Sequence, residues 1–214
     1  MLSCLTLAFA ALLHDPSDSA DDPNVCRCAV VRATDGWCAK CGVGYYASQR
    51  IALQKIFEVL DITGHEVFAD RTACPTCRSI ILHGGFCDAC NMGFIHGRGF
   101  FTRLCYHMAR GRPVPPAATQ SACCPSDGAW CMKCRTGRIG NRVFLDQSEF
   151  EAARKYYAVF TSALREASRC ETCAIAMIAN SRCHLCRLEY KDGARVEAPA
   201  HPASSKPAAK SDIK

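Results

Sequence analysis

The sequence predicts a small metal-stapled α+β fold, with four similar units arranged as two duplicated halves. The chain has 18 Cys among 214 residues, which is far above ordinary usage. Most of these Cys come in close pairs, and the segments after the pairs look alike. Each segment is typical of a short strand, a tight turn and a second strand. We therefore expect small cross-linked units with β-hairpins and short amphipathic helices in place of one large apolar core.

The spacing of the Cys pairs indicates the duplication. Each regular unit reads C-x-x-C, nine residues, C-x-x-C, formed first by Cys74, Cys77, Cys87 and Cys90, and again by Cys170, Cys173, Cys183 and Cys186. All four positions of the first set recur 96 residues later, from 74 to 170. Two units in each half give a period of about 48 residues, which is typical of repeat proteins.

The first and third units depart from this pattern. Their Cys are Cys26, Cys28, Cys38 and Cys41 in the first unit, and Cys123, Cys124, Cys131 and Cys134 in the third. Neighbouring cysteines seldom point at one ion, so the third unit is expected to be distorted, three-coordinate or empty. For both irregular units the alternative is a disulfide, or a fold that has lost its ion.

Changes in composition predict the domain boundaries. Residues 24–110 form the first half and residues 123–196 the second, joined by a Pro/Ala-rich linker at 111–122. The Ala/Pro/Lys/Ser-rich residues 197–214 are expected to form a disordered tail. Residues 1–23 form an N-terminal tail or a signal peptide.

The N-terminal segment favours export. Its apolar run from Leu5 to Leu13 is too short to span a bilayer. Ala8-Phe9-Ala10 fits the small-x-small cleavage pattern of a secretory signal, although no positively charged region precedes it. We therefore expect a periplasmic protein without a transmembrane span, and a cytoplasmic location is the alternative.

Helices are expected after three of the four hairpins. Apolar residues at helical spacing, followed by Gly64, predict the first of them, from Leu53 to Leu60. The same spacing from Phe101 to Met108 places Cys105 on the buried face, so we interpret it as a core thiol and not as a ligand. In the third unit, Asp146 and Glu149 resemble a capping box at the start of a longer helix.

The sixteen paired cysteines are the predicted metal ligands. Zinc binds four thiolates tetrahedrally at about 2.3 Å. Two C-x-x-C turns, brought together by a short hairpin, supply such a set. Tetrahedral sulfur also suits iron, which remains the alternative metal.

With these paired C-x-x-C motifs the units resemble zinc ribbons, and in particular the short double zinc ribbons that occur in tandem. The match covers residues 74–90 and 170–186 and says little about the segments between them. The resemblance implies a structural metal and a binding or scaffolding role, and not catalysis.

Other Cys chemistries fit less well. A thioredoxin-like redox pair needs C-x-x-C at a helix N-terminus in a βαβ unit, whereas these pairs are expected in turns beside hairpins. Covalent haem needs C-x-x-C-H, and no pair is followed by His. No Ser/His/Asp group, phosphate-binding glycine loop or pair of catalytic carboxylates stands out. We therefore expect a protein that is not an enzyme.

Three functions follow from this interpretation. The first is a zinc-binding scaffold or protein-interaction module, exported from the cytoplasm. The second is sequestration or delivery of a soft metal, for which many thiols are suited. The third is nucleic-acid binding, which the formal charge of +6 superficially favours. Because each Zn(Cys)₄ centre carries a net charge of −2, four loaded sites would leave about −2, which weakens that argument.

An exported protein raises a conflict, because an oxidising compartment favours disulfides over zinc thiolates. Metal loading before oxidation would protect the thiolates. Export without metal would instead allow disulfides across the hairpins. In either case the cross-links replace a core that each unit is too small to form.

Overall fold

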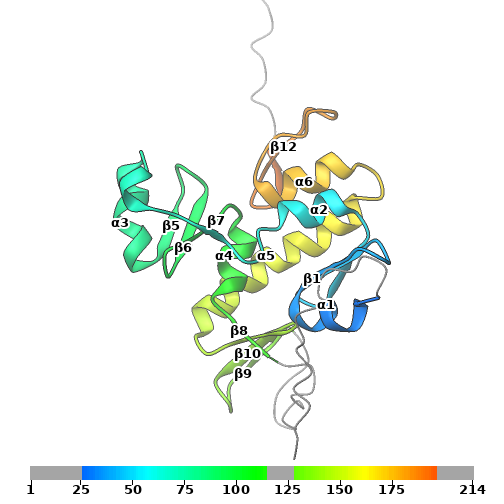
Figure 1. Cartoon of the computed structure of the whole chain (residues 1–214), viewed down its shortest axis with the longest axis horizontal. Helices are drawn as coiled ribbons and strands as arrows, with labels where there is room; N and C mark the ends of the chain where they lie inside the picture. Colours follow the sequence, from blue (N-terminus) through cyan, green and yellow to red (C-terminus); the bar gives the residue numbers. More distant parts are fainter. Residues whose placement is uncertain (1–25, 115–127, 197–214) are drawn as a thin grey trace, which may run out of the picture.

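The computed structural model describes residues 26–114 and 128–196 (Figure 1). The predicted signal peptide at 1–23 and the tail at 197–214 lie outside these ranges. So do Cys123 and Cys124, together with most of the linker predicted at 111–122.

The first two units share one order of elements: a short helix, a three-stranded antiparallel meander and a second helix. The first unit contains α1 (Cys28–Thr34), β1 (Gly36–Cys38), β2 (Val43–Tyr46), β3 (Gln49–Ile51) and α2 (Gln54–Val59). The second contains β4 (His65–Glu66), the 3₁₀ turn η1 (Ala69–Arg71), α3 (Pro75–His83), β5 (Gly85–Cys87), β6 (Met92–Ile95), β7 (Arg98–Phe100) and α4 (Arg103–Ala109).

The second half varies this order. It contains β9 (Trp130–Cys131), β10 (Thr136–Ile139), β11 (Arg142–Phe144), α5 (Gln147–Glu166), α6 (Glu171–Ala179), β12 (Glu189–Lys191) and β13 (Ala194–Val196). Strand β8 (Arg112–Pro113) falls in the predicted linker and pairs with β11, so it joins the sheet of the third unit. Every named strand pair is antiparallel.

The hairpin turns predicted from sequence are confirmed. Strand pairing leaves two residues in each loop: His96-Gly97, Gly140-Asn141 and Asp192-Gly193. In the first and last of these turns both residues have positive φ, as a type I′ turn requires. The turn Ala47-Ser48 has the same geometry without a glycine.

The predicted helices α2, α4 and α5 are also confirmed. At the start of α5, the Asp146 carboxylate accepts a hydrogen bond of 2.9 Å from the Glu149 amide, as the capping box predicts. Cys105 is fully buried in α4, in agreement with its predicted role as a core thiol. Among the described residues, no helix is both long enough and apolar enough to cross a bilayer.

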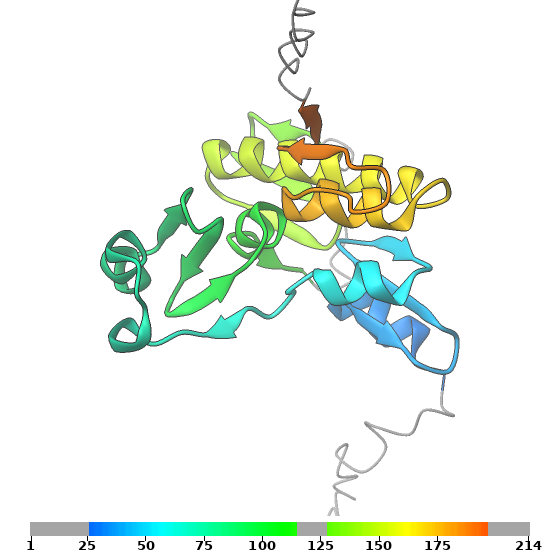
Figure 2. The same cartoon turned by 90° about the horizontal axis from the view of Figure 1, so that it is seen from above.

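One hydrophobic core joins the two halves around the long helix α5 (Figure 2). Phe150 and Phe160 of α5 are fully buried in it. Elements of all four units pack against α5, and they contribute Ile51, Ile56, Leu104, Met108, Ile139 and Ile178 among others. Three smaller clusters lie apart from this core, each built around cysteines. The halves therefore fold together, while the cysteine groups lie at the periphery.

A buried polar junction connects the first and third units. The Asp35 carboxylate is fully buried and accepts hydrogen bonds from the Ala47 amide (2.9 Å), Asn141 Nδ2 (3.0 Å) and Arg142 Nη2 (3.1 Å). A Cβ on Gly140 would lie 2.1 Å from the Ala47 carbonyl oxygen. The two hairpin turns therefore meet at a distance that only glycine permits.

The second and fourth units meet through a similar set of contacts. Asn91 Nδ2 donates to the Ala179 carbonyl oxygen at 3.3 Å. Arg103 pairs with Asp88 and lies 3.6 Å from Asp192. These contacts join the first unit with the third and the second with the fourth, while α2 of the first unit also packs against α6 of the fourth and α4 of the second against α5 of the third.

Candidate metal centres

The first Cys pair of the second unit lies at the start of a helix. Cys74 is the N-cap of α3, Pro75 occupies the first turn, and Cys77 follows in the same turn. The helix ends at Gly84, whose φ of 78° is left-handed. The prediction that this pair lies in a turn beside a hairpin is therefore wrong, because the pair lies in the first turn of a helix. Pro at the helix start and Gly at its end were the signals that could have predicted it.

The same arrangement occurs in the fourth unit and, more loosely, in the first. Cys170 is the N-cap of α6, whose Ala-rich sequence favours a helix and which ends at Asn180 with φ 50°. Cys28 is the first residue of α1. In these units half of the sulfur ligands thus come from a helix N-terminus and half from a hairpin.

The second Cys pair lies in a tight turn between two strands, as predicted. In all four units the residue after the last Cys has a left-handed conformation: Gly42 (φ 59°), Asn91 (φ 50°), Arg135 (φ 54°) and Arg187 (φ 57°). This turn directs backbone N–H groups at sulfur. The Cys186 amide lies 3.3 Å from Cys183 Sγ. In the first unit the Arg27 amide, between the two cysteines of the first pair, also lies 3.4 Å from Cys38 Sγ.

The described residues contain three groups of four cysteines that could hold a metal ion. In each group all four sulfur atoms lie within 4.8 Å of one another, and the groups are Cys26, Cys28, Cys38 and Cys41; Cys74, Cys77, Cys87 and Cys90; and Cys170, Cys173, Cys183 and Cys186. Four sulfurs at about 2.3 Å from one ion are about 3.8 Å apart. The Sγ–Sγ distances agree: 3.5 Å for Cys26–Cys41, and 3.9 Å for both Cys74–Cys87 and Cys170–Cys183. These donor sets fit a tetrahedral metal ion.

The third unit contributes only its second pair to the described residues. Cys131 ends β9, and its Sγ accepts a hydrogen bond of 3.4 Å from the Cys134 amide, as Cys183 does from Cys186 in the fourth unit. Their predicted partners, Cys123 and Cys124, lie outside the described ranges. The structure thus presents three four-cysteine groups where the sequence predicted four.

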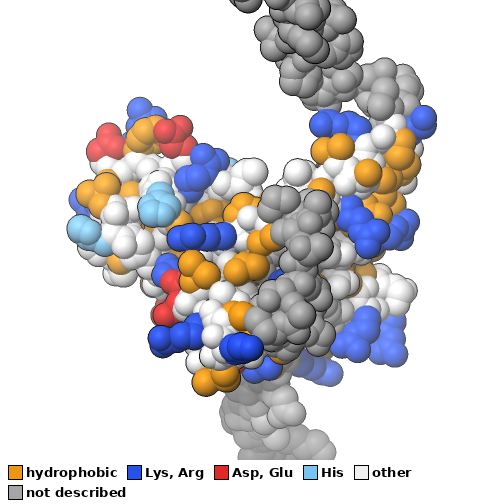
Figure 3. Space-filling view, turned by 90° about the horizontal axis from the view of Figure 1, so that it is seen from below, with side chains coloured by type: hydrophobic (Ala, Val, Ile, Leu, Met, Phe, Trp, Pro, Cys, Tyr) orange, Lys and Arg blue, Asp and Glu red, His pale blue; other side chains and the backbone are white. Residues whose placement is uncertain are grey.

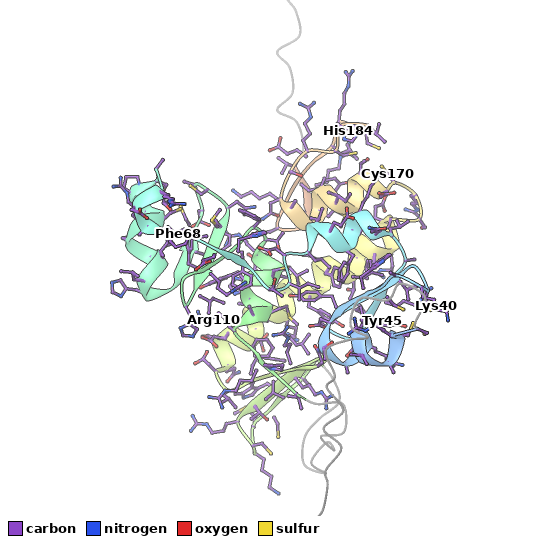
Figure 4. The ribbon with its side chains drawn as sticks, viewed as in Figure 1. Lys40, Tyr45, Phe68, Arg110, Cys170 and His184 are labelled. Atoms are coloured by element: carbon purple, nitrogen blue, oxygen red, sulfur yellow. The ribbon has the colours of Figure 1, made fainter. Side chains whose placement is uncertain are left out.

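The cysteines at corresponding positions of the second and fourth units are buried to the same degree. The second and third cysteines of each group are buried, whereas the fourth, Cys90 or Cys186, is exposed. The turns that carry the second pairs project from the body. Lys40 and His184, which lie within such turns, point outward in Figure 4. Each group is therefore closed on the side of the protein and accessible from the side of its turn.

Hydrogen bonds to sulfur favour the thiolate form of at least one Cys in each group. The Cys77 amide lowers the pKa of Cys74 to about 6, and the Thr172 hydroxyl lowers the pKa of Cys183 to about 6. The Arg27 amide lowers the pKa of Cys38 to about 7. Metal binding must still displace protons from other members, because burial raises the pKa of Cys173 to about 12.

Thr172 is a site residue that the spacing of the cysteines did not reveal. Its hydroxyl lies 3.2 Å from Cys170 Sγ and 3.1 Å from Cys183 Sγ, so it connects the two pairs of the fourth unit. The second unit has Thr76 at the same place between its first two cysteines. A hydroxyl residue at that position of C-x-x-C was the available signal.

A thioredoxin-like redox site requires C-x-x-C at a helix N-terminus within a βαβ unit. The first Cys pairs of the second and fourth units meet the first of these requirements. The other requirement is a βαβ unit, which needs parallel strands, and the strand pairs named here are antiparallel.

No protein-family model matches the chain, and no curated protein or solved structure is similar to it. The interpretation of the centres therefore depends on the geometry of their sulfur atoms.

Proposed function

We propose that this protein is a non-enzymatic zinc-binding protein whose metal centres support a protein-interaction module. The observation that carries the proposal is that each of the three groups supplies four sulfur ligands. Catalytic zinc sites usually have three protein ligands and keep the fourth position open, whereas four cysteines fill the coordination shell. Such centres are suited to holding structure together.

The positions of the centres support the same role. Apart from its cysteines, the buried part of the small cluster in the second unit consists of Ile81 and Phe94. In the fourth unit the corresponding residues are Ala176 and Tyr190. These clusters are too small to order the surrounding helix and hairpin, so a cross-link at the sulfurs is needed. Zinc is the proposed ion because it suits four thiolates and brings no redox chemistry.

The proposal is tested by comparing a chelator with a reductant. A strong chelator should remove the metal and abolish amide protection in α3 and α6, while mild reductant should leave both helices folded. Native mass spectrometry of the same samples should report tightly held zinc, and cross-linking in cells should capture a protein partner. Loss of the helices with reductant alone would favour disulfides.

Metal handling is a second candidate, favoured by one observation. Cys26, Cys41, Cys90 and Cys186 are exposed, which gives a competing ligand access to at least one sulfur in each group. Exchange of isotopically labelled zinc separates the two candidates. A scaffold should keep its metal while it remains folded, whereas a delivery protein should exchange it within minutes.

Nucleic-acid binding receives less support. Lys and Arg side chains outnumber acidic ones on the face shown in Figure 3. However, three loaded Zn(Cys)₄ centres would bring the formal charge of +6 to about zero. Of the three aromatic residues after the cysteine turns that could stack on bases, Tyr46 and Phe94 are buried and Tyr45 is half-buried. Salt-sensitive retention on immobilised nucleic acid would support this alternative.

Export also remains part of the proposal. It depends on residues 1–23, which lie outside the described ranges. Cell fractionation with N-terminal sequencing tests it: cleavage after Ala10 and recovery from the periplasm support export, and an intact N-terminus in the cytoplasm contradicts it.

A further inference from the structure

A groove of about 450 Å³ lies beside the C-terminal end of α2 and the start of α4, away from the cysteine groups. Its walls are mostly apolar and include Phe57, Leu60, Ile62 and Phe101. Asp61 lies among these residues. A carboxylate in a largely apolar groove suggests a binding site, because such sites combine apolar walls with a few polar groups.

The Asp61 carboxylate is buried and incompletely satisfied. Its side chain is only 9% exposed, and its Oδ2 atom accepts no hydrogen bond. His65 Nε2 lies 3.2 Å from Oδ2, but it does not form a hydrogen bond with this atom. Burial raises the pKa of Asp61, more than the nearby amides of Gly64 and Phe101 lower it. A buried acceptor without a donor is destabilising, and its presence requires an explanation.

The other charged groups around the groove are already engaged. Arg98 donates to the carbonyl oxygens of Thr63 (2.6 Å) and Gly64 (2.7 Å). Asp35 is paired with Arg142. Glu58 is solvent-exposed and accepts a hydrogen bond from Gln54 of its own helix. Asp61 Oδ2 is therefore the buried carboxylate atom of the groove that lacks a hydrogen-bond donor, whereas Glu58 is exposed and solvated.

The aromatic walls favour a cationic donor over a neutral one. Phe101 is 49% exposed at the edge of the groove, and its ring lies 4.7 Å from that of His65. Phe57 packs against Trp37 with a ring separation of 5.5 Å. A cation near an aromatic face gains additional attraction, and an aliphatic stem would cover the apolar walls.

We propose that this groove binds the side chain of an arginine or lysine presented by a partner protein, with Asp61 as its anion and Phe101 as its aromatic wall. The inference rests on the proposed function as an interaction module and specifies the chemistry of the partner. The guanidinium or ammonium group would supply the donor that Asp61 Oδ2 lacks. The stem of the same side chain would cover Leu60 and Ile62.

The test uses the full metal-loaded chain, labelled with ¹⁵N and titrated with short peptides. The probe is acetyl-Gly-Arg-Gly-amide, with the lysine peptide as a second cation and the citrulline peptide as an uncharged analogue of arginine. All peptides are titrated at the same pH and ionic strength. We expect saturable shifts of the Asp61, Thr63 and Phe101 amides with the cationic peptides, and at least about tenfold weaker binding of citrulline.

Matched variants identify the anion. Asp61→Asn should weaken binding of the arginine peptide at least about tenfold, while Asp70→Asn, the same change at an exposed site outside the groove, should leave it within about twofold. Phe101→Ala should weaken binding without changing the charge, and it provides the test if Asp61→Asn fails to fold. Equal binding of citrulline, or unchanged affinity in both groove variants, would overturn the proposal.

The outcomes also separate this proposal from the proposed function. If a partner is captured by cross-linking equally well in the Asp61 and Phe101 variants, the interaction module is supported. The proposal that the partner binds in the groove is then overturned. Binding of the arginine peptide that Asp61→Asn abolishes supports the groove, even where no partner is captured and the wider function fails.

Discussion

Two buried cysteines of the second unit allow a matched test of the metal centres. Cys87 belongs to a four-sulfur group and is 1% exposed, whereas Cys105 is 0% exposed and belongs to none of the three groups. Replacing either one by Ser makes the same chemical change at a buried site. We expect Cys87→Ser to unfold the region around α3 and β5, and Cys105→Ser to weaken the fold without opening it.

The expected magnitudes differ because the two thiols have different roles. Burial of Ile81 and Phe94, the other buried residues of the small cluster, contributes about 3–6 kcal/mol. A structural zinc site in a small peptide contributes about 10–16 kcal/mol. Loss of one zinc ligand is therefore expected to remove more stabilising free energy than burial of the apolar cluster provides. Cys105→Ser costs about 1–3 kcal/mol, since it buries a hydroxyl in the main core.

Hydrogen exchange measured by mass spectrometry distinguishes these results. In Cys87→Ser, amides from Thr76 to Met92 should lose protection while those of α5 keep it, and native mass spectra should show one metal ion fewer. In Cys105→Ser the metal count should not change, and any loss of protection should be spread over the main core. Equal metal counts and equal protection of α3 in the two variants would refute the reasoning.

Three further predictions concern the junctions and pH. Asp35→Asn should destabilise the protein by about 3–5 kcal/mol in urea unfolding, because it leaves Arg142, only 14% exposed, without its counter-ion. Glu151→Gln, which breaks the exposed pair with Arg154, should cost less than about 1 kcal/mol, and similar costs for the two would contradict the buried junction. Gly140→Ala should destabilise the protein by several kcal/mol, because its Cβ would lie 2.1 Å from the Ala47 carbonyl oxygen. Gly97 also has a positive φ of 76° but has open space around it, so Gly97→Ala should cost only about 1–2 kcal/mol. Equal shifts in melting temperature for the two variants would show that the turns are not in contact. Burial lowers the pKa of His107 to about 4 from an ordinary 6.5, so the unfolded chain binds more protons between these values and stability falls as pH decreases through 6.5. The His107→Gln variant lacks this titrating group. Between pH 7.5 and 5.5 the native protein should therefore lose about 1 kcal/mol more unfolding free energy than the variant, after allowance for the partial exposure of His107. Parallel plots of unfolding free energy against pH would contradict this assignment.

Local features of the fold were predictable from sequence because short-range physics determines them. Asp192-Gly193 and His96-Gly97 form the expected turns since Gly tolerates positive φ. Asp146 caps α5 through a contact only three residues away. Cys105 was assigned to the core from its place in an apolar helical repeat, and it is buried there. The two regular cysteine groups followed from spacing alone.

The structure of the first Cys pairs was not predictable from spacing alone. C-x-x-C can converge on one ion from a turn or from the first turn of a helix, so the motif does not distinguish the two. In the second unit Pro75 and Gly84 decide for the helix, and in the fourth the Ala-rich segment before Asn180 does so. The zinc-ribbon resemblance predicts hairpins at the Cys pairs and therefore gives no indication of these helices.

The association of the units depends on contacts that no local pattern encodes. Arg142 and Asp35 are 107 residues apart in sequence, and Asn91 and Ala179 are 88 apart. The sequence indicated two successive halves, whereas these contacts join the first unit with the third and the second with the fourth. Such pairings depend on the shape of the main core around α5, which only the structure reveals.

The central claim is that tetrahedral sulfur coordination holds the peripheral units together. X-ray absorption at the zinc edge, recorded on protein purified from its own cellular compartment, measures this coordination directly. Four sulfur neighbours at about 2.3 Å from each zinc ion are predicted. A zinc environment dominated by oxygen or nitrogen, or protein that carries no zinc while its helices stay folded, would contradict the claim.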